Sequence, residues 1–328
     1  MESFIFALTA VSPIIIMVAV GYILKKLGVI DGDFAKKANK LVFRLLLPSM
    51  LFLNVYNIEA VENIELGYIV YVLLAILLIF ILALPIVILV SREQGSRGVL
   101  LQAFFRSNYA LIGIPLAESL IGNEVTAIAS ILSAFTIPLF NTLAVISLSI
   151  FNGGGKKPKF KRIISDVIKN PLIVGVLLGV LVLFLRLGAE KIGIEARLSD
   201  ITPLFKVLSY LSSTATPLAL LVLGAQFEFS AVPSLKKEII FGVIARTIAV
   251  PIIGIGGAYL FFGDLFTGAH FATFVAVFAT PIAVSSVPMA QEMEGNVALA
   301  GQLVVWTTLV SSFTVFLASF LLKNAGVF

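Results

Sequence analysis

Long apolar runs separated by short polar stretches fill the chain from end to end. Each run has about 20 residues, the length that an α-helix needs to cross the hydrocarbon core of a bilayer. Apolarity within a run is continuous, whereas a membrane β-barrel strand would alternate apolar and polar positions. The pattern predicts ten membrane-spanning helices, at residues 4–25, 34–56, 67–90, 98–121, 125–150, 170–187, 203–226, 238–262, 268–291 and 297–322.

Composition agrees with lipid as the solvent of these helices. The 328 residues are 59% hydrophobic and 12% charged, whereas an ordinary soluble domain is roughly 45–50% apolar and about 25% charged. Cysteine is absent and there is one histidine, which excludes thiolate chemistry and His clusters for a metal. The net charge of +5 lies in short loops between apolar runs. This placement favours a basic cytoplasmic face over nucleic-acid binding, and we expect no cofactor.

The distribution of lysine and arginine predicts the orientation. Most basic residues outside the spans fall in loops on one side, and the linker 151–169 is the richest of them. The positive-inside rule places that side in the cytoplasm and both termini outside the cell membrane. Five spans precede the linker and five follow it. The segments 1–150 and 170–328 are therefore expected to be two five-helix repeats of opposite orientation, joined by a basic cytoplasmic linker.

Proline and glycine recur at corresponding places in the two halves. The alternative to a repeat is chance matching of apolar helices, which the shared order of several matches disfavours. The pairs are Pro13 and Gly21 with Pro171 and Gly179, then Pro85 with Pro251, then Pro115 and Gly122 with Pro288 and Gly295. Inverted repeats whose corresponding helices are interrupted by proline or glycine are typical of secondary transporters.

The prolines of the fourth and ninth spans suggest a binding site. Proline removes a backbone donor and clashes with the preceding turn, so we expect Pro115 and Pro288 to mark helix breaks that cross at the midplane. Backbone groups freed in lipid need protein, water or ligand as partners. The half-helix after each proline would direct its N-terminus toward the midplane, and helix N-termini attract anions.

Several motifs resemble the auxin efflux carrier family, which includes the plant PIN-formed carriers and many prokaryotic relatives. They are Asn39-Lys40-Leu41-Val42 with Pro48, Asn108 with Gly113-Ile114-Pro115-Leu116, Ala215-Thr216-Pro217-Leu218-Ala219 with Gly224, and Val287-Pro288 with Ala290-Gln291-Glu292. The resemblance covers all ten spans.

The resemblance implies a fold shared with bile acid symporters and sodium–proton antiporters. In that fold the first, second, sixth and seventh helices form a scaffold, and a transport domain holds the two broken helices. The family's substrates are organic anions such as auxin or dicarboxylates. The span 67–90 lacks an acidic residue that plant members place near the site, so the resemblance does not extend to aromatic auxin.

The predicted substrate contacts lie around the two prolines. Asn108 either contacts substrate or bonds another helix, because an amide within a span needs a partner. The hydroxyls before Pro288 either bind substrate or satisfy carbonyl groups freed by proline. Glu118 is a candidate proton or cation site, with a solvated surface position as the alternative. The predicted substrate-binding set is Asn108, Gly113, Ile114, Pro115, Thr280, Ser285, Ser286, Pro288 and Gln291.

Cationic side chains are not expected at the centre of this site. Neither 107–155 nor 247–322 contains lysine or arginine, so amides and helix dipoles would hold the anion. Arg106 is read as snorkelling to lipid headgroups, with the steering of anions as the alternative. Arg246 lies deeper in its span and should pair with another group, and His270 should lie at the outer interface.

We therefore predict an all-α integral membrane protein that acts as a secondary active or facilitative carrier of small organic anions, by elevator-type alternating access. The alternatives are a cation-coupled symporter or a sensor on the same fold; an enzyme is disfavoured because the spans lack a catalytic constellation. Expected partners are a carboxylate substrate, the bilayer, a second copy in a homodimer, and a proton or sodium as candidate coupling ion.

Overall fold

The computed structural model describes residues 2–58, 65–122, 124–151, 160–193, 195 and 197–328. All regular elements in this part of the chain are helices, apart from one isolated β-bridge. Seven helices are long and apolar enough to cross a membrane: Gly32–Tyr56, Leu66–Val90, Val125–Ile150, Pro171–Glu190, Thr202–Gln226, Phe229–Leu265 and Val297–Asn324. The predicted all-helical membrane fold is confirmed at this level, while the count of ten spans stays a prediction.

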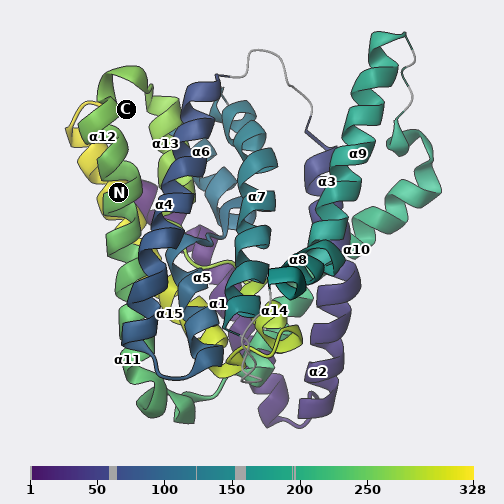
Figure 1. The fold of residues 1–328 in the computed structure, drawn as a ribbon, viewed down its shortest axis with the longest axis vertical. Helices are drawn as coiled ribbons and strands as arrows, with labels where there is room; N and C mark the ends of the chain where they lie inside the picture. The colour runs from purple at the N-terminus through teal and green to yellow at the C-terminus, as the bar shows by residue number, and fades with distance from the viewer. Residues whose placement is uncertain (1, 59–64, 123, 152–159, 194, 196) are drawn as a thin grey trace.

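The first half of the chain forms α1 to α7 (Figure 1). Two short π-helical segments are continuous with these helices: η1 joins α2 to α3, and η2 runs directly into α6. The bounds are α1 Glu2–Lys26, α2 Gly32–Leu41, η1 Val42–Leu46, α3 Leu47–Tyr56, α4 Leu66–Val90, α5 Gln94–Phe105, η2 Tyr109–Gly113, α6 Ile114–Ile121 and α7 Glu124–Ile150.

The second half begins with α8, Phe160–Lys169, which lies within the predicted linker. This helix occupies the second part of the expected linker 151–169, and residues 152–159 lie outside the described residues. The remaining bounds are α9 Pro171–Lys191, η3 Leu198–Asp200, α10 Thr202–Gln226, η4 Phe229–Ala231, α11 Val232–Ile244, η5 Ala245–Ala249, η6 Ile252–Gly256, α12 Gly257–Phe262, η7 Gly263–Leu265, α13 Gly268–Phe278, α14 Ser286–Glu292 and α15 Val297–Asn324.

Four chain segments pack into one group, here called the panel: α1, the continuous helix α2–η1–α3, α9 and α10. Glycines let their backbones approach closely. A Cβ on Gly21 of α1 would lie 2.0 Å from the Leu221 carbonyl oxygen of α10, and a Cβ on Gly224 of α10 would lie 2.0 Å from the Val18 oxygen of α1. A Cβ on Gly175 of α9 would lie 2.5 Å from the Pro48 oxygen of α3. Small residues at such crossings are typical of helix packing in membranes.

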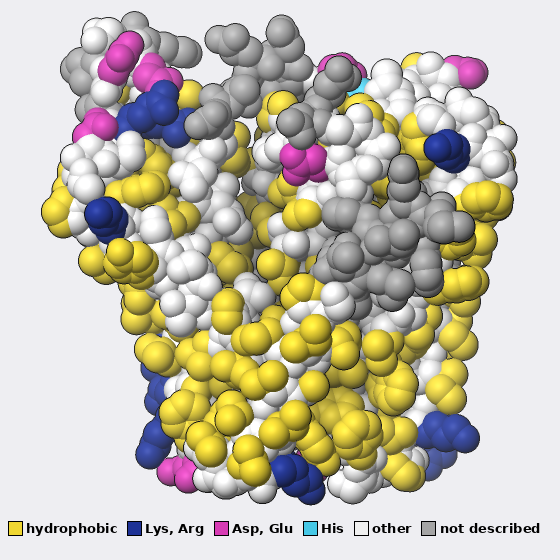
Figure 2. Space-filling view, turned by 180° about the vertical axis from the view of Figure 1, so that it is seen from behind, with side chains coloured by type: hydrophobic (Ala, Val, Ile, Leu, Met, Phe, Trp, Pro, Cys, Tyr) yellow, Lys and Arg dark blue, Asp and Glu magenta, His cyan; other side chains and the backbone are white. Residues whose placement is uncertain are grey.

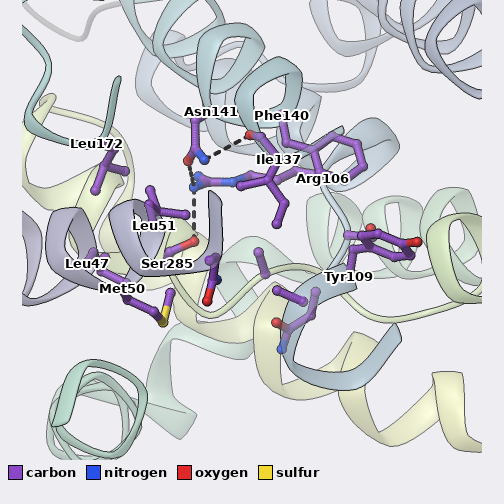
Figure 3. A pocket seen from close by; sticks show the side chains of 15 residues that line it. Leu47, Met50, Leu51, Arg106, Tyr109, Ile137, Phe140, Asn141, Leu172 and Ser285 are labelled. Atoms are coloured by element: carbon purple, nitrogen blue, oxygen red, sulfur yellow. Dashed lines mark hydrogen bonds between the residues drawn. The ribbon is translucent and has the colours of Figure 1, made fainter. Parts of the chain in front are cut away.

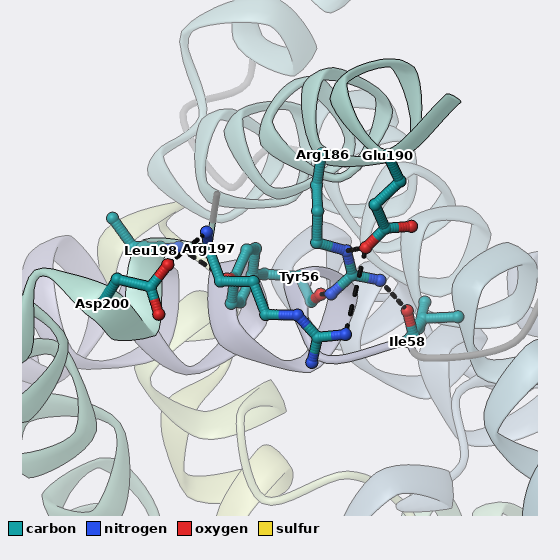
Figure 4. A network of polar contacts seen from close by, with 7 residues as sticks. All are labelled: Tyr56, Ile58, Arg186, Glu190, Arg197, Leu198 and Asp200. Carbon is teal, nitrogen blue, oxygen red and sulfur yellow. Dashed lines mark hydrogen bonds and ion pairs between the residues drawn. The ribbon is translucent and has the colours of Figure 1, made fainter. Parts of the chain in front are cut away.

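A polar network ties the upper ends of α3 and α9 together (Figure 4). The Arg186 guanidinium donates to the backbone oxygens of Tyr56 and Ile58, at 3.0 and 2.5 Å. Glu190 lies 3.7 Å from the Arg186 Nε and 4.0 Å from Arg197. The guanidinium thereby satisfies carbonyl groups at the C-terminal end of α3 and fixes this corner of the panel.

The helices α4 to α7 and α11 to α15 form a second group, here called the core group, and α8 contacts both α7 of this group and α9 of the panel. Large apolar side chains on its outside face away from the protein, among them Leu89, Leu260 and Phe261, which are 81%, 75% and 78% exposed. Figure 2 shows hydrophobic side chains covering much of the lower part of one face, with acidic residues mainly at the upper end and basic residues at both ends. An apolar belt of this kind is what lipid contact requires.

Candidate functional site

Two helix breaks meet inside the core group. The first separates α5 from η2 at residues 106–108, and the second separates α13 from α14 at residues 279–285. Ser107 and Ile282 pair as an isolated antiparallel bridge. The Asn108 N–H donates to the Pro281 oxygen at 2.8 Å, and the Ala283 N–H donates to the Arg106 oxygen at 3.3 Å. The breaks thus satisfy part of each other's backbone, which lets non-helical chain persist in an apolar interior.

The breaks do not lie at the two prolines that were expected to make them. Pro115 lies in the first turn of α6, seven residues after the first break, and its side chain is exposed. Pro288 lies within α14, three residues after the second break, and is buried. Proline suits the first turn of α14 because the N–H that it lacks has no partner there, whereas Pro115 lies within the continuous helix Tyr109–Ile121, where η2 runs into α6. The motif around each proline therefore marks the half-helix that follows the break.

Two neighbouring hollows, of ≈ 60 and ≈ 170 Å³, lie between the bridge and the panel. Both are larger than the 10–15 Å³ or so that one water needs. Apolar side chains from α3, α7 and α9 form much of the wall of the first (Figure 3). Both hollows are lined by Leu47, Met50, Asn54, Asn108, Ala110 and Ser285. We treat them as one cavity at the crossing.

Arg106 is the charged group of this cavity, and its side chain is only 2% exposed. Its guanidinium donates to Asn141 Oδ1 at 2.9 Å and to Ser285 Oγ at 3.0 Å (Figure 3). Two further bonds go to Gln102 Oε1 at 2.7 Å and the Met289 sulfur at 3.0 Å. Across the described residues, none of the ion pairs involves Arg106. The cation is held by neutral acceptors alone.

This position corrects two expectations from the sequence. Arg106 does not snorkel to the membrane surface, because α5 begins at Gln94 and carries it a full helix length into the protein. The site also does not lack a cationic side chain, since Arg106 opens the first break. The stretch without lysine or arginine begins one residue later, at Ser107.

Asn108 supplies an unused donor beside Arg106. It is 8% exposed, and its amide Nδ2 is buried without a hydrogen-bond partner. The Ser107 hydroxyl, which also lines the first hollow, is buried without a partner as well. Leaving a buried donor unsatisfied costs about 1–3 kcal/mol. Donors gathered around one cavity in this way indicate a binding site whose ligand would satisfy them.

The other predicted residues do not gather at the cavity. Gly113 serves close packing, since a Cβ there would lie 2.8 Å from the Ala276 oxygen of α13. The Thr280 hydroxyl donates to the same oxygen at 2.7 Å. Ile114 and Glu118 are half-buried on α6. Neither of them, nor Gly113, Pro115, Thr280, Ser286, Pro288 or Gln291, lines the two hollows, and whether any of them contacts substrate stays a prediction.

Gln291 belongs instead to a cluster of amides that joins α14 to the panel. Its Oε1 accepts a bond from Asn39 Nδ2 and another from Gln226 Nε2, both at 2.9 Å. Asn39 also donates to Gln226 Oε1 at 2.8 Å. Close by, Arg44 of η1 pairs with Glu292 of α14 at 3.2 Å. These contacts connect the two groups of helices on one side of the crossing.

Asn54 and Asn141 were missed as site residues, although the sequence held a signal for them. Both are amides within apolar spans, and the reasoning applied to Asn108 applies equally to them. Asn54 lines both hollows, and Asn141 lines the smaller one and binds Arg106. What the sequence could not show is which of the three amides face the same space.

Comparison with known proteins gives the family. A protein of Methanothermobacter thermautotrophicus is 24% identical over 302 residues, which cover 91% of this chain and 92% of that protein. A protein of Methanocaldococcus jannaschii is 28% identical over 238 residues, which cover 71% of each chain. Both are described as uncharacterized transporters. The family model described as membrane transport protein matches residues 6–319, so the chain belongs to the membrane transport protein family.

Proposed function

We propose that this transporter is a secondary carrier of small organic anions, with carboxylates as the class of substrate, and that it binds them in the cavity at the crossing. One observation carries the proposal: Arg106 is a buried cation that meets only neutral acceptors, beside the unpaired amide donor of Asn108. An anion in the cavity would supply the missing negative charge.

Electrostatics explains why an anion fits better than a cation or a neutral solute. A buried charge without a counter-ion is costly, so the empty site favours a ligand of opposite sign. A carboxylate accepts several hydrogen bonds at once, and a guanidinium donates them in a planar fork. The helix Tyr109–Ile121 also begins at the cavity, and the positive end of its dipole adds to the attraction.

The walls limit what the substrate can be. Leu47, Met50 and Leu51 of α3 face the crossing, with Ile137 and Phe140 of α7 and Leu172 of α9 beside them. The two hollows are small, with volumes of ≈ 60 and ≈ 170 Å³. These features favour a compact carboxylate whose uncharged part lies against the aliphatic wall.

Movement of the core group against the panel would carry the site across the membrane. The panel is built reciprocally, as α1 of the first half packs on α10 of the second while α9 of the second packs on α3 of the first. This exchange is what two inverted repeats of five helices would produce, and it supports an elevator-type motion of the crossing against the panel. The basic lower end would face the cytoplasm, with both termini outside.

Binding and uptake together test the proposal. The purified protein should melt at higher temperature with a carboxylate that it binds, because a ligand of the folded state stabilises it. Arg106→Gln should lose this response at the concentrations that saturate the wild-type protein, and Asn108→Ala should need more carboxylate for the same shift. Arg92→Gln, which changes an exposed arginine away from the cavity, should respond like the wild-type protein. An unchanged response in both cavity variants would refute the site. A response without saturable uptake in vesicles would indicate a sensor instead of a carrier.

A further inference from the structure

A second buried arginine binds backbone carbonyl groups at the crossing. Arg246 lies in the π-helical segment η5 and is 0% exposed. Its Nε donates to the Thr280 carbonyl oxygen at 2.7 Å, its Nη2 to the Val277 oxygen at 2.8 Å, and its Nη1 to the Phe104 oxygen at 3.5 Å. The expectation that Arg246 pairs with another group is confirmed, and its partners are backbone carbonyl groups.

These carbonyl groups come from the ends of two half-helices. Phe104 lies in the last turn of α5, Val277 lies in the last turn of α13, and Thr280 follows it within the second break. The C-terminal end of a helix carries a partial negative charge, so two such ends at one place repel each other. In secondary transporters, carbonyl groups at the C-terminal ends of broken helices are the groups that coordinate a coupling cation.

The positive charge among these carbonyl groups is that of the Arg246 side chain. None of the ion pairs in the described residues involves Arg246, so its charge is balanced by the carbonyl dipoles. The first half has no counterpart. Arg246 lies five residues before Pro251, and Phe80 lies five residues before Pro85. Phe80 packs on the ring of Phe105 with the centroids 5.4 Å apart.

We propose that Arg246 is a built-in cation of the crossing, which occupies the place where a transporter of another design would bind sodium, and that transport by this chain needs no monovalent metal ion. The guanidinium already donates to all three carbonyl oxygens, so a second cation at this place would meet the positive charge of Arg246. The statement about transport rests on the proposed carrier function; the statement about Arg246 does not.

Thermal melting of the purified protein tests the built-in cation without any substrate. Wild-type protein should melt at the same temperature in sodium, potassium and choline chloride of equal ionic strength. Arg246→Ala should melt about 5–10 °C lower in choline, and sodium or methylguanidinium should recover part of the loss by binding to the exposed carbonyl groups. Arg106→Ala is the matched control, since its guanidinium binds mainly side-chain acceptors and sodium should not rescue it.

Two results would overturn the inference. One is a sodium-dependent rise in the melting temperature of the wild-type protein, which would show that a metal ion binds in addition to Arg246. The other is an Arg246→Ala variant that responds to no cation. If Arg246→Ala does not fold, Arg246→Lys takes its place: the retained charge should preserve folding, and Arg246→Met, which has similar volume without charge, should not.

Uptake by reconstituted vesicles then tests the second statement. The rate for a carboxylate that the wild-type protein transports should be unchanged when sodium is replaced by choline on both sides. A loss of uptake without sodium would overturn independence from a metal ion. Absence of uptake for every carboxylate in both salts would contradict the proposed function, while the melting result for Arg246 would still stand or fall by itself.

Discussion

The two breaks that meet at Ser107 and Ile282 differ in length and in what they contribute. The first spans three residues, 106–108, and all of them are polar. It supplies the side chains of Arg106 and Asn108 to the cavity. The second spans seven residues, 279–285, and contributes mainly backbone: the Thr280 carbonyl oxygen bonds Arg246 and the Pro281 oxygen bonds Asn108. Only Ser285 adds a polar side chain to the cavity wall.

This difference separates two tasks that a crossing must perform. Arg106 faces the cavity and meets neutral side chains, so its charge is available to a ligand. Arg246 faces the backbone behind the bridge, where carbonyl groups use its charge. We expect loss of the first arginine to impair binding more than folding, and loss of the second to impair folding more than binding.

The largest effect on function should come from Arg106→Gln. Glutamine keeps a donor near Asn141 and Ser285 but removes the positive charge. Hydrogen bonds to charged groups contribute about 1.5–3 kcal/mol each, so substrate affinity should fall roughly 100-fold. Uptake as a function of substrate concentration, corrected for surface abundance, measures this. Unchanged affinity, or a loss of abundance that accounts for the whole decrease, would contradict the division of tasks.

Asn108→Ala should have the next largest effect. It removes the unpaired Nδ2 donor without disturbing the backbone bond from the Asn108 N–H to Pro281. A single neutral hydrogen bond contributes about 1 kcal/mol, so affinity should fall about five- to tenfold. Asn57→Ala changes an exposed asparagine at the end of α3 and should leave affinity unaltered. An equal effect of the two substitutions would mean that Asn108 does not contact substrate.

A smaller effect is expected where α14 meets the panel. Gln291→Ala removes the acceptor shared by Asn39 and Gln226, and loss of about 1–2 kcal/mol of bonding should favour separation of the two groups of helices. The chain has no cysteine, so a cysteine introduced at Ala110 in the cavity wall reports access. Its labelling from the cytoplasmic side should be faster in Gln291→Ala and unchanged in Lys37→Ala, an exposed neighbour on α2. Equal labelling would show that the amide cluster does not control access.

The sequence was sufficient for the helices and insufficient for the breaks. Continuous apolar runs located most long helices within a few residues, because a segment in lipid must satisfy its backbone internally. The exception is the helix Phe229–Leu265, which begins nine residues before the predicted span 238–262. The breaks were misplaced because proline was read as their cause. Their position depends instead on pairing between residues 106–108 and residues 279–285, which are far apart in sequence. Only the folded chain brings these two stretches together.

The roles of the two buried arginines show the same limit. A single arginine in an apolar span predicts a functional or paired group, and that expectation holds for both. Sequence distance to the end of a span suggested that Arg106 reaches the surface, yet it opens the first break. Which arginine faces a cavity and which faces carbonyl groups depends on the rotation of each helix. No local pattern in the sequence records that rotation.

The smallest effect is expected from Pro115→Ala, and it separates the two explanations of the first break. If the proline made the break, alanine would allow a continuous helix and abolish transport. The structure places Pro115 in the first turn of α6 with its ring exposed, and the pairing of Ser107 with Ile282 does not involve it. Alanine is a good helix former, so uptake should stay within about twofold of wild type, a difference of less than about 0.5 kcal/mol.

Pro288→Ala should cost more, about 1 kcal/mol of stability, because Pro288 is buried and alanine leaves a gap. The repeat taken alone predicts equal effects of the two substitutions, whereas burial predicts unequal ones. Uptake and melting temperature of both variants distinguish these outcomes, and loss of transport in Pro115→Ala at normal abundance would restore the proline as the cause of the break.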